Sequence, residues 1–111
     1  MRVVFHPEFA KDIRRFGAEY ARISEGLAKR FRNEVDQALD AIKSSPTSAG
    51  HFLFVRSAVV SDLRRRNLKS FPHFVLYGCS GDQIFFGSLI PSRSDPLTWL
   101  SRFAGKGSAD L

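Results

Sequence analysis

The chain has 111 residues, of which 43% are hydrophobic, and a formal net charge of +6 at pH 7. This length fits one domain that buries about 65% of its unfolded surface, and eleven phenylalanines can supply the core without a metal or a disulfide. The single cysteine, Cys79, excludes an internal disulfide, so we expect a buried free thiol in a reducing compartment. Because no apolar run at the N-terminus is long enough for a signal peptide or a membrane span, we expect a cytoplasmic protein.

The first half of the chain predicts a strand followed by two helices. Residues 2–5 are typical of a short strand, and Pro7 and Glu8 suit the first turn of a helix. Apolar side chains then recur along one helix face, at Phe9, Ile13, Phe16 and Tyr20. Ser24 is the expected N-cap of a second amphipathic helix that stops at Pro46. The short connection predicts that the two helices pack as an antiparallel hairpin.

Beyond residue 50 the apolar period shortens to about two residues, which is typical of strands. Residues 51–61 contain two short apolar runs whose register the sequence leaves open. We expect strands at 62–70, 72–79 and 83–90. The sequence Asp95-Pro96 predicts the start of a short C-terminal helix.

These elements predict a single domain over residues 1–104, with a disordered tail at 105–111. The expected fold class is α+β with two layers. In it an N-terminal strand and an antiparallel helix hairpin pack on an antiparallel meander sheet, and a short C-terminal helix follows. The other face of the sheet, flanked by arginines, is expected to be available to a partner.

Positive charge is concentrated in the second half of the chain. Residues 1–50 carry nine basic and seven acidic side chains, whereas residues 51–103 carry seven and three. This excess favours an anionic partner. The candidate binding residues are Arg64, Arg65, Arg66, Lys69, Arg93 and Arg102. Strand alternation sends consecutive arginines to both faces of a sheet, and charge on an edge strand that prevents aggregation stays open as an alternative.

Neither a metal site nor a cofactor site is predicted, because the three histidines are isolated from one another and from Cys79 and no phosphate-binding loop is present. His73 and Tyr77 share one face of their strand by parity and both can transfer protons, so they are the candidate catalytic pair of a phosphodiesterase. The alternative for Tyr77 is a core residue with its hydroxyl at the rim.

Three segments together resemble the RelE/ParE toxin superfamily of type II toxin–antitoxin systems. They are the opening strand with Pro7-Glu8, the run Leu63-Arg64-Arg65 followed by Phe71-Pro72 and Tyr77, and the pattern Arg93-x-Asp95-Pro96-x-x-Trp99-x-x-Arg102. The resemblance covers residues 2 to 103. It implies a RelE-like fold, bacterial growth inhibition, and a hetero-oligomer with a cognate antitoxin that neutralises the toxin. The implied target is either DNA gyrase or mRNA on the ribosome.

The sequence departs from the pattern of the ribosome-dependent mRNA endonucleases. Those members carry a Lys-x-Lys pair where this chain has Arg65 and Asn67, an Arg where it has Phe74, and a Tyr where it has Trp99. This chain keeps cations that can bind phosphate, but it lacks the proton-transfer groups of those endonucleases. We therefore favour a ParE-like gyrase toxin that is not an enzyme. A RelE-type endoribonuclease that uses His73, and a non-toxic binding module, are the alternatives.

Overall fold

The computed structural model describes residues 2–47, 51–53, 62–94 and Arg102. Its elements, in chain order, are β1 (Arg2–Phe5), α1 (Phe9–Ala21), α2 (Glu25–Ser44), β2 (His51–Leu53), β3 (Asp62–Asn67), β4 (His73–Ser80) and β5 (Gln83–Pro91). The first strand, both helices and the three later strands are thus where the sequence predicted them, to within a few residues. The helix expected after Asp95 and the expected tail lie outside the described residues.

Local sequence explains where the helices begin and which faces they bury. The Ser24 hydroxyl accepts a hydrogen bond from the backbone N–H of Leu27 at 3.0 Å, so it caps α2 as expected. Helix α1 buries Phe9, Ile13 and Phe16 against the sheet, as its stripe predicts, and it also buries Asp12.

The strands form one sheet in the order β1-β5-β4-β3-β2. Strands β2 to β5 pair antiparallel as the expected meander. Strand β1 adds to it by pairing parallel with β5, Val3 opposite Ile84, so the sheet is mixed. The register between β4 and β5 shifts by one residue at Gly87, where Leu76 lies opposite Ser88 but Tyr77 lies opposite Phe86.

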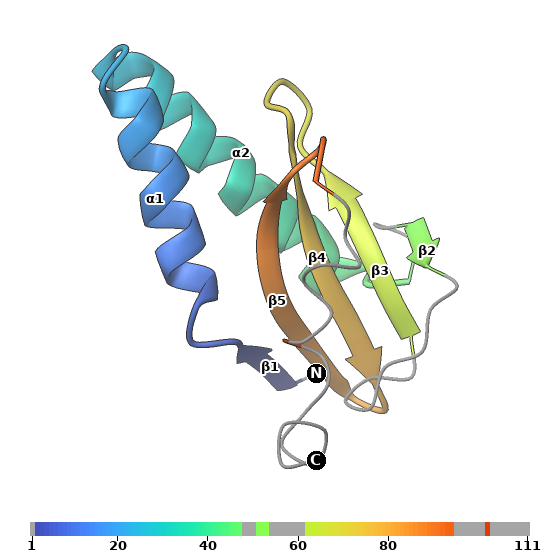
Figure 1. Ribbon diagram of the computed structural model, residues 1–111. Coiled ribbons are helices and arrows are strands. Elements are labelled where there is room, and N and C mark those ends of the chain that lie inside the picture. The colour runs from blue at the N-terminus through green and yellow to red at the C-terminus, as the bar shows by residue number, and fades with distance from the viewer. Residues whose placement is uncertain (1, 48–50, 54–61, 95–101, 103–111) are drawn as a thin grey trace.

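The helix hairpin covers one face of this sheet (Figure 1), with α1 packed on β5 and α2 packed on β3. Between the layers lies the main core, which includes Phe31 and Val35 of α2 and the helix-facing residues of β4 and β5. Cys79 is among these buried residues as a free thiol, as predicted, and burial raises its pKa. Within the described residues, neither helix is long and apolar enough to cross a membrane.

The opposite face of the sheet is also buried along β3, β4 and β5. Leu63, Phe74, Leu76 and Ile90 alternate with the helix-facing residues, and each is at most 2% exposed. The expectation that this face is open to a partner is therefore wrong at these positions. This face is buried because a large apolar side chain such as Phe74 stabilises the domain only when folding removes it from water.

Candidate functional site

The arginine triplet is divided between the two faces of the sheet, as strand alternation predicts. Arg64 lies opposite Tyr77 and Arg66 opposite Val75, so both are on the helix side. Arg64 is held there by the Asp62 carboxylate, 3.0 Å from its Nε, and by the backbone carbonyl of Thr47, which accepts from its guanidinium at 2.8 Å. Arg64 thus ties β3 to the segment that follows α2.

Arg65 lies on the other face, opposite Leu76. Its guanidinium carbon is 3.8 Å from the centre of the Phe74 ring, a distance at which a cation attracts the ring electrons. Its guanidinium also donates to the side-chain oxygen of Asn67 at 2.9 Å. Arg65 therefore covers a core phenylalanine, which is a structural role that the sequence did not indicate.

Arg66 and Lys69 line a small pocket of about 210 Å³ beside α2. Glu34 of α2 is in the same pocket and accepts a hydrogen bond from the backbone N–H of Ser70 at 2.8 Å. Two cations and one carboxylate leave this pocket electropositive. It is the place where the structure brings two of the predicted cations together.

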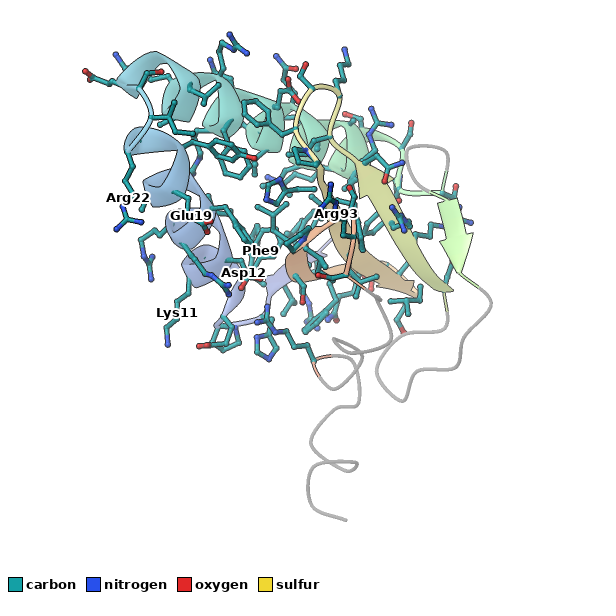
Figure 2. All side chains as sticks on the ribbon, turned by 45° about the horizontal axis from the view of Figure 1, so that its top comes forward. Phe9, Lys11, Asp12, Glu19, Arg22 and Arg93 are labelled. Atoms are coloured by element: carbon teal, nitrogen blue, oxygen red, sulfur yellow. The ribbon has the colours of Figure 1, made fainter. Side chains whose placement is uncertain are left out.

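Arg102 contacts α1 and β5. Its guanidinium donates to the Asp12 carboxylate at 2.6 and 3.3 Å and to the carbonyl of Gly87 at 3.0 Å. The same carboxylate accepts the backbone N–H of Leu89 at 3.1 Å. Figure 2 shows Asp12 turned toward the sheet, whereas Lys11 points away from it. This arrangement gives Arg102 a buried structural partner in place of an anionic ligand.

Sequence reasoning did not identify Asp12 as a buried residue. The spacing of the apolar residues in α1 could have indicated that Asp12 is buried. Asp12 follows Phe9 by three residues and precedes Phe16 by four, so it lies within the apolar stripe of α1. A charged residue inside such a stripe indicates a buried partner.

His73 is buried at the start of β4, with 5% of its surface exposed. Its ring lies among aromatic rings, with centroid distances of 4.6 Å to Phe16, 5.3 Å to Phe31 and 6.0 Å to Tyr20. Burial lowers its pKa, although the charge of Glu19 acts in the opposite direction. The imidazole is therefore neutral at pH 7, and its Nδ1 has no hydrogen-bond partner among the described residues.

Tyr77 is fully buried in the core between the helices and the sheet. Its hydroxyl donates to the backbone carbonyl of Pro46 at 2.5 Å. Burial and the neighbouring Cys79 raise the pKa of Tyr77 to about 12. These observations favour the core role for Tyr77 over the catalytic one.

A pocket that His73 lines has a volume of about 650 Å³, and we call it the His73 pocket. It lies between the second half of α1 and the neighbouring ends of β4 and β5. Its lining is mostly apolar, and Arg93 is on its β5 side. In Figure 2, Glu19 and Arg22 lie along α1, and Arg93 lies across from them. Sequence reasoning did not identify Glu19 or Arg22 as site residues.

The predicted cations therefore do not form one patch on the sheet rim. Arg66 and Lys69 share the small pocket beside α2, and Arg93 shares the His73 pocket with His73. Among the described residues, no group of three or more histidine, cysteine or acidic side chains is placed to hold a metal ion.

No protein-family model and no curated protein matches the chain. Among solved structures, it is similar to a chain described as "Chromosomal ParDE TA system from P. aeruginosa". The TM-score is 0.67 and the sequence identity 15%, and the similarity covers 82% of this chain and 95% of the other. At this identity the similarity establishes a common fold. The chain therefore has the RelE/ParE-like fold that its sequence motifs implied.

Proposed function

We propose that this protein is the toxin of a type II toxin–antitoxin system, that it inhibits growth in the cytoplasm by acting on DNA gyrase, and that a cognate antitoxin neutralises it. The toxin assignment is supported by two independent lines. One is the fold shared with a ParDE chain across 95% of that chain. The other is the set of sequence motifs that resemble the RelE/ParE superfamily.

The burial of His73 and Tyr77 is the observation that favours gyrase over mRNA cleavage. A general acid or base must come within hydrogen-bond reach of the proton that it transfers. The Tyr77 hydroxyl is bonded to the Pro46 carbonyl within the fold, and its pKa is raised to about 12. A protein that traps gyrase needs a binding surface but no such group.

One observation favours the second candidate, a ribosome-dependent endoribonuclease. His73 and Arg93 line the same pocket, so a base and a phosphate-binding cation are close enough to share a ligand. In that mechanism His73 would accept the proton of a 2′-hydroxyl while Arg93 binds the adjacent phosphate.

Controlled expression in a bacterium that lacks the gene of the cognate antitoxin tests these functions. A gyrase toxin should give filamentous cells, induce the DNA-damage response and trap purified gyrase on cleaved plasmid. Rapid mRNA cleavage in translating ribosomes, with gyrase unaffected, would select the nuclease. Normal growth at high expression of folded protein would support the non-toxic binding module.

The substitution His73→Gln separates the two mechanisms at the level of a residue. A nuclease that uses His73 as its base should lose about 10²–10⁴-fold in cleavage rate. A gyrase toxin should keep its potency, provided that circular dichroism shows a folded variant. Loss of toxicity in a folded His73→Gln variant would contradict the gyrase assignment.

A further inference from the structure

The small pocket beside α2 has the size and the charge of a site for one anionic group. Arg66, Lys69, Gln37 and Asn67 line it, and Glu34 is the one carboxylate among the described residues of its lining. Its volume of about 210 Å³ is below the range of about 300–1,000 Å³ that is common for sites of whole small molecules. The pocket therefore suits a single group of a larger partner, and its cations favour a negative one.

The fold itself already uses the negative charge of Glu34. Its carboxylate accepts the backbone N–H of Ser70, in the turn between β3 and β4, at 2.8 Å. Burial acts to raise the pKa of Glu34, but hydrogen bonds from Ser70 and Lys69 and the charge of Arg30 outweigh it and hold this pKa below its ordinary value. Glu34 is therefore ionised at pH 7, and it offsets only one of the cations around it.

Arg30 adds a third cation on the same face of α2. The residues of this helix that line the pocket are Glu34, Gln37, Ala38 and Ala41. Arg30 precedes Glu34 by four residues, so helical spacing places the two side chains next to each other. Three cations and one carboxylate thus lie together where α2 packs on β3, and this surface carries an excess of positive charge.

The apolar part of the lining distinguishes between classes of anionic partner. It consists of Ala38, Ala41 and Leu68, with no aromatic ring among the described residues. Proteins that bind single-stranded nucleic acids stack bases on aromatic side chains, and partner proteins gain most of their affinity from large buried anchors. The backbone of a nucleic-acid duplex needs neither, since cations and amides contact its phosphates directly. An isoelectric point of about 10.1 is also typical of proteins that bind nucleic acids.

We propose that Arg30, Arg66 and Lys69 bind the sugar–phosphate backbone of a nucleic-acid duplex, with one phosphate group in the small pocket. Lys69 and Arg66 pair with the oxygens of this phosphate. A guanidinium group has five N–H donors, so Arg66 binds a phosphate in addition to its contacts within the fold. Arg30 pairs with a neighbouring phosphate, and binding is independent of base sequence. The inference does not rest on the toxin function proposed above.

Fluorescence anisotropy of the full-length protein with a labelled DNA duplex of about 20 base pairs tests this proposal. We expect binding at about 50 mM salt that weakens steeply as salt is added, because phosphate contacts release counterions. Two duplexes of unrelated sequence should bind alike. Absence of binding at this salt concentration would overturn the proposal, as would a single strand that binds at least as tightly as the duplex.

Matched variants locate the binding surface. Arg30→Gln and Lys69→Gln, at two exposed positions, should each weaken binding at least threefold and reduce the slope of log K against log salt by about 1. Arg66→Gln should do the same if circular dichroism shows a folded variant. Arg32→Gln removes the same charge from α2 at an exposed ion pair with Asp36, and as the control it should change neither value. Equal losses in all variants would show that only net charge matters and would overturn the site.

Competition with poly-glutamate separates a duplex from an acidic protein segment. We expect poly-glutamate to displace the duplex only at a charge concentration at least tenfold above that of the DNA. Displacement at equal charge concentration would indicate an acidic protein segment and overturn the proposal. The toxin function is tested separately by growth. Duplex binding through Arg30 and Lys69 in a chain that is not toxic would support this site and overturn the toxin function, and toxicity without duplex binding would do the reverse.

Discussion

Asp12 and His73 are both buried polar side chains that lie between α1 and the sheet, yet their surroundings are opposite. The Asp12 carboxylate accepts hydrogen bonds from Arg102 and from the backbone N–H of Leu89. His73 is surrounded by aromatic rings, and its Nδ1 has no partner among the described residues. The fold therefore supplies hydrogen-bond partners for the Asp12 carboxylate, whereas the described residues supply none for Nδ1 of His73.

This difference decides how each side chain affects the stability of the domain. A buried polar group whose partners all belong to the chain stabilises a particular packing, and its loss is felt as instability. A buried polar group without a partner lowers stability, because it has lost its hydrogen bonds to water and has gained none in the fold. Substitutions at the two positions should therefore change the stability of the domain with opposite signs.

The largest effect is expected for Asp12→Ala. This substitution leaves the Arg102 guanidinium and the Leu89 N–H without their shared acceptor, inside a region where both side chains of the ion pair are at most 14% exposed. Removal of one partner of a buried pair costs about 3–5 kcal/mol, and we expect about 3 kcal/mol in the free energy of unfolding measured in urea.

The control for Asp12 is Asp36→Ala, which breaks the exposed ion pair with Arg32 on α2. Exposed pairs at this helical spacing contribute about 0.3–0.5 kcal/mol. A loss at Asp12 no larger than the loss at Asp36 would show that the buried contacts to Arg102 and Leu89 are not formed in solution.

The substitution His73→Phe should have the opposite sign and a smaller size. A phenyl ring keeps the contacts with Phe16, Tyr20 and Phe31 and removes the unpaired nitrogen. We expect the free energy of unfolding to increase by about 1 kcal/mol, at the lower limit of the cost of a buried unsatisfied group. Thermal and urea denaturation of the free protein measure this change, and a destabilised variant would indicate that Nδ1 is satisfied in solution.

The contrast between local and long-range information explains what the sequence could predict. Capping by Ser24, the apolar stripes of the helices and the division of Arg64 and Arg65 between two faces depend on neighbouring residues, and these predictions were confirmed. The contact between Asp12 and Arg102 joins positions 90 residues apart. The spacing of the apolar residues in α1 could have predicted that Asp12 is buried, but no nearby residue indicates which side chain pairs with it.

The His73 pocket was beyond sequence reasoning for the same reason. Its walls come from α1, from the start of β4 and from the end of β5, and they meet only after the sheet has formed. Parity placed His73 and Tyr77 on one face, which is correct, because Tyr77 belongs to the core beneath the helices and the His73 ring contacts Phe16 of α1. It did not reveal that Tyr77 would bond to the Pro46 carbonyl whereas the Nδ1 atom of His73 would lack a partner.

The pH dependence of stability offers a finer comparison of the buried groups. Burial lowers the pKa of His73 in the folded protein below the ordinary value of 6.5, against the opposing charge of Glu19. As the pH falls below 6.5, the unfolded chain binds a proton at this position before the folded chain does. Stability is therefore full above pH 6.5 and decreases on acidification, by at most about 1.4 kcal/mol per pH unit.

A comparison of wild type with His73→Phe isolates this contribution, because the difference in unfolding free energy between them should grow as the pH falls from 7 toward 5. His6 also has a lowered pKa, through burial and the charge of Arg102, but it is present in both proteins and its contribution cancels. A difference that is independent of pH would mean that the imidazole of His73 is accessible to protons in the folded state.

The last comparison concerns Arg65, whose partners are the Phe74 ring and the Asn67 amide. Phe74 is fully buried but uncharged. If the burial of its partner decides how much a polar contact stabilises the fold, Arg65→Ala should lower the free energy of unfolding by more than the loss of an exposed ion pair. It should lower it by less than Asp12→Ala. We expect about 1 kcal/mol in urea denaturation, from the cation–ring contact and the lost cover of the ring. The substitution Arg65→Lys should recover only part of this loss, since an ammonium group cannot stack on the ring while also forming the planar contact with Asn67. Full recovery by lysine would show that positive charge alone, and not the stacked guanidinium, stabilises this face of the sheet.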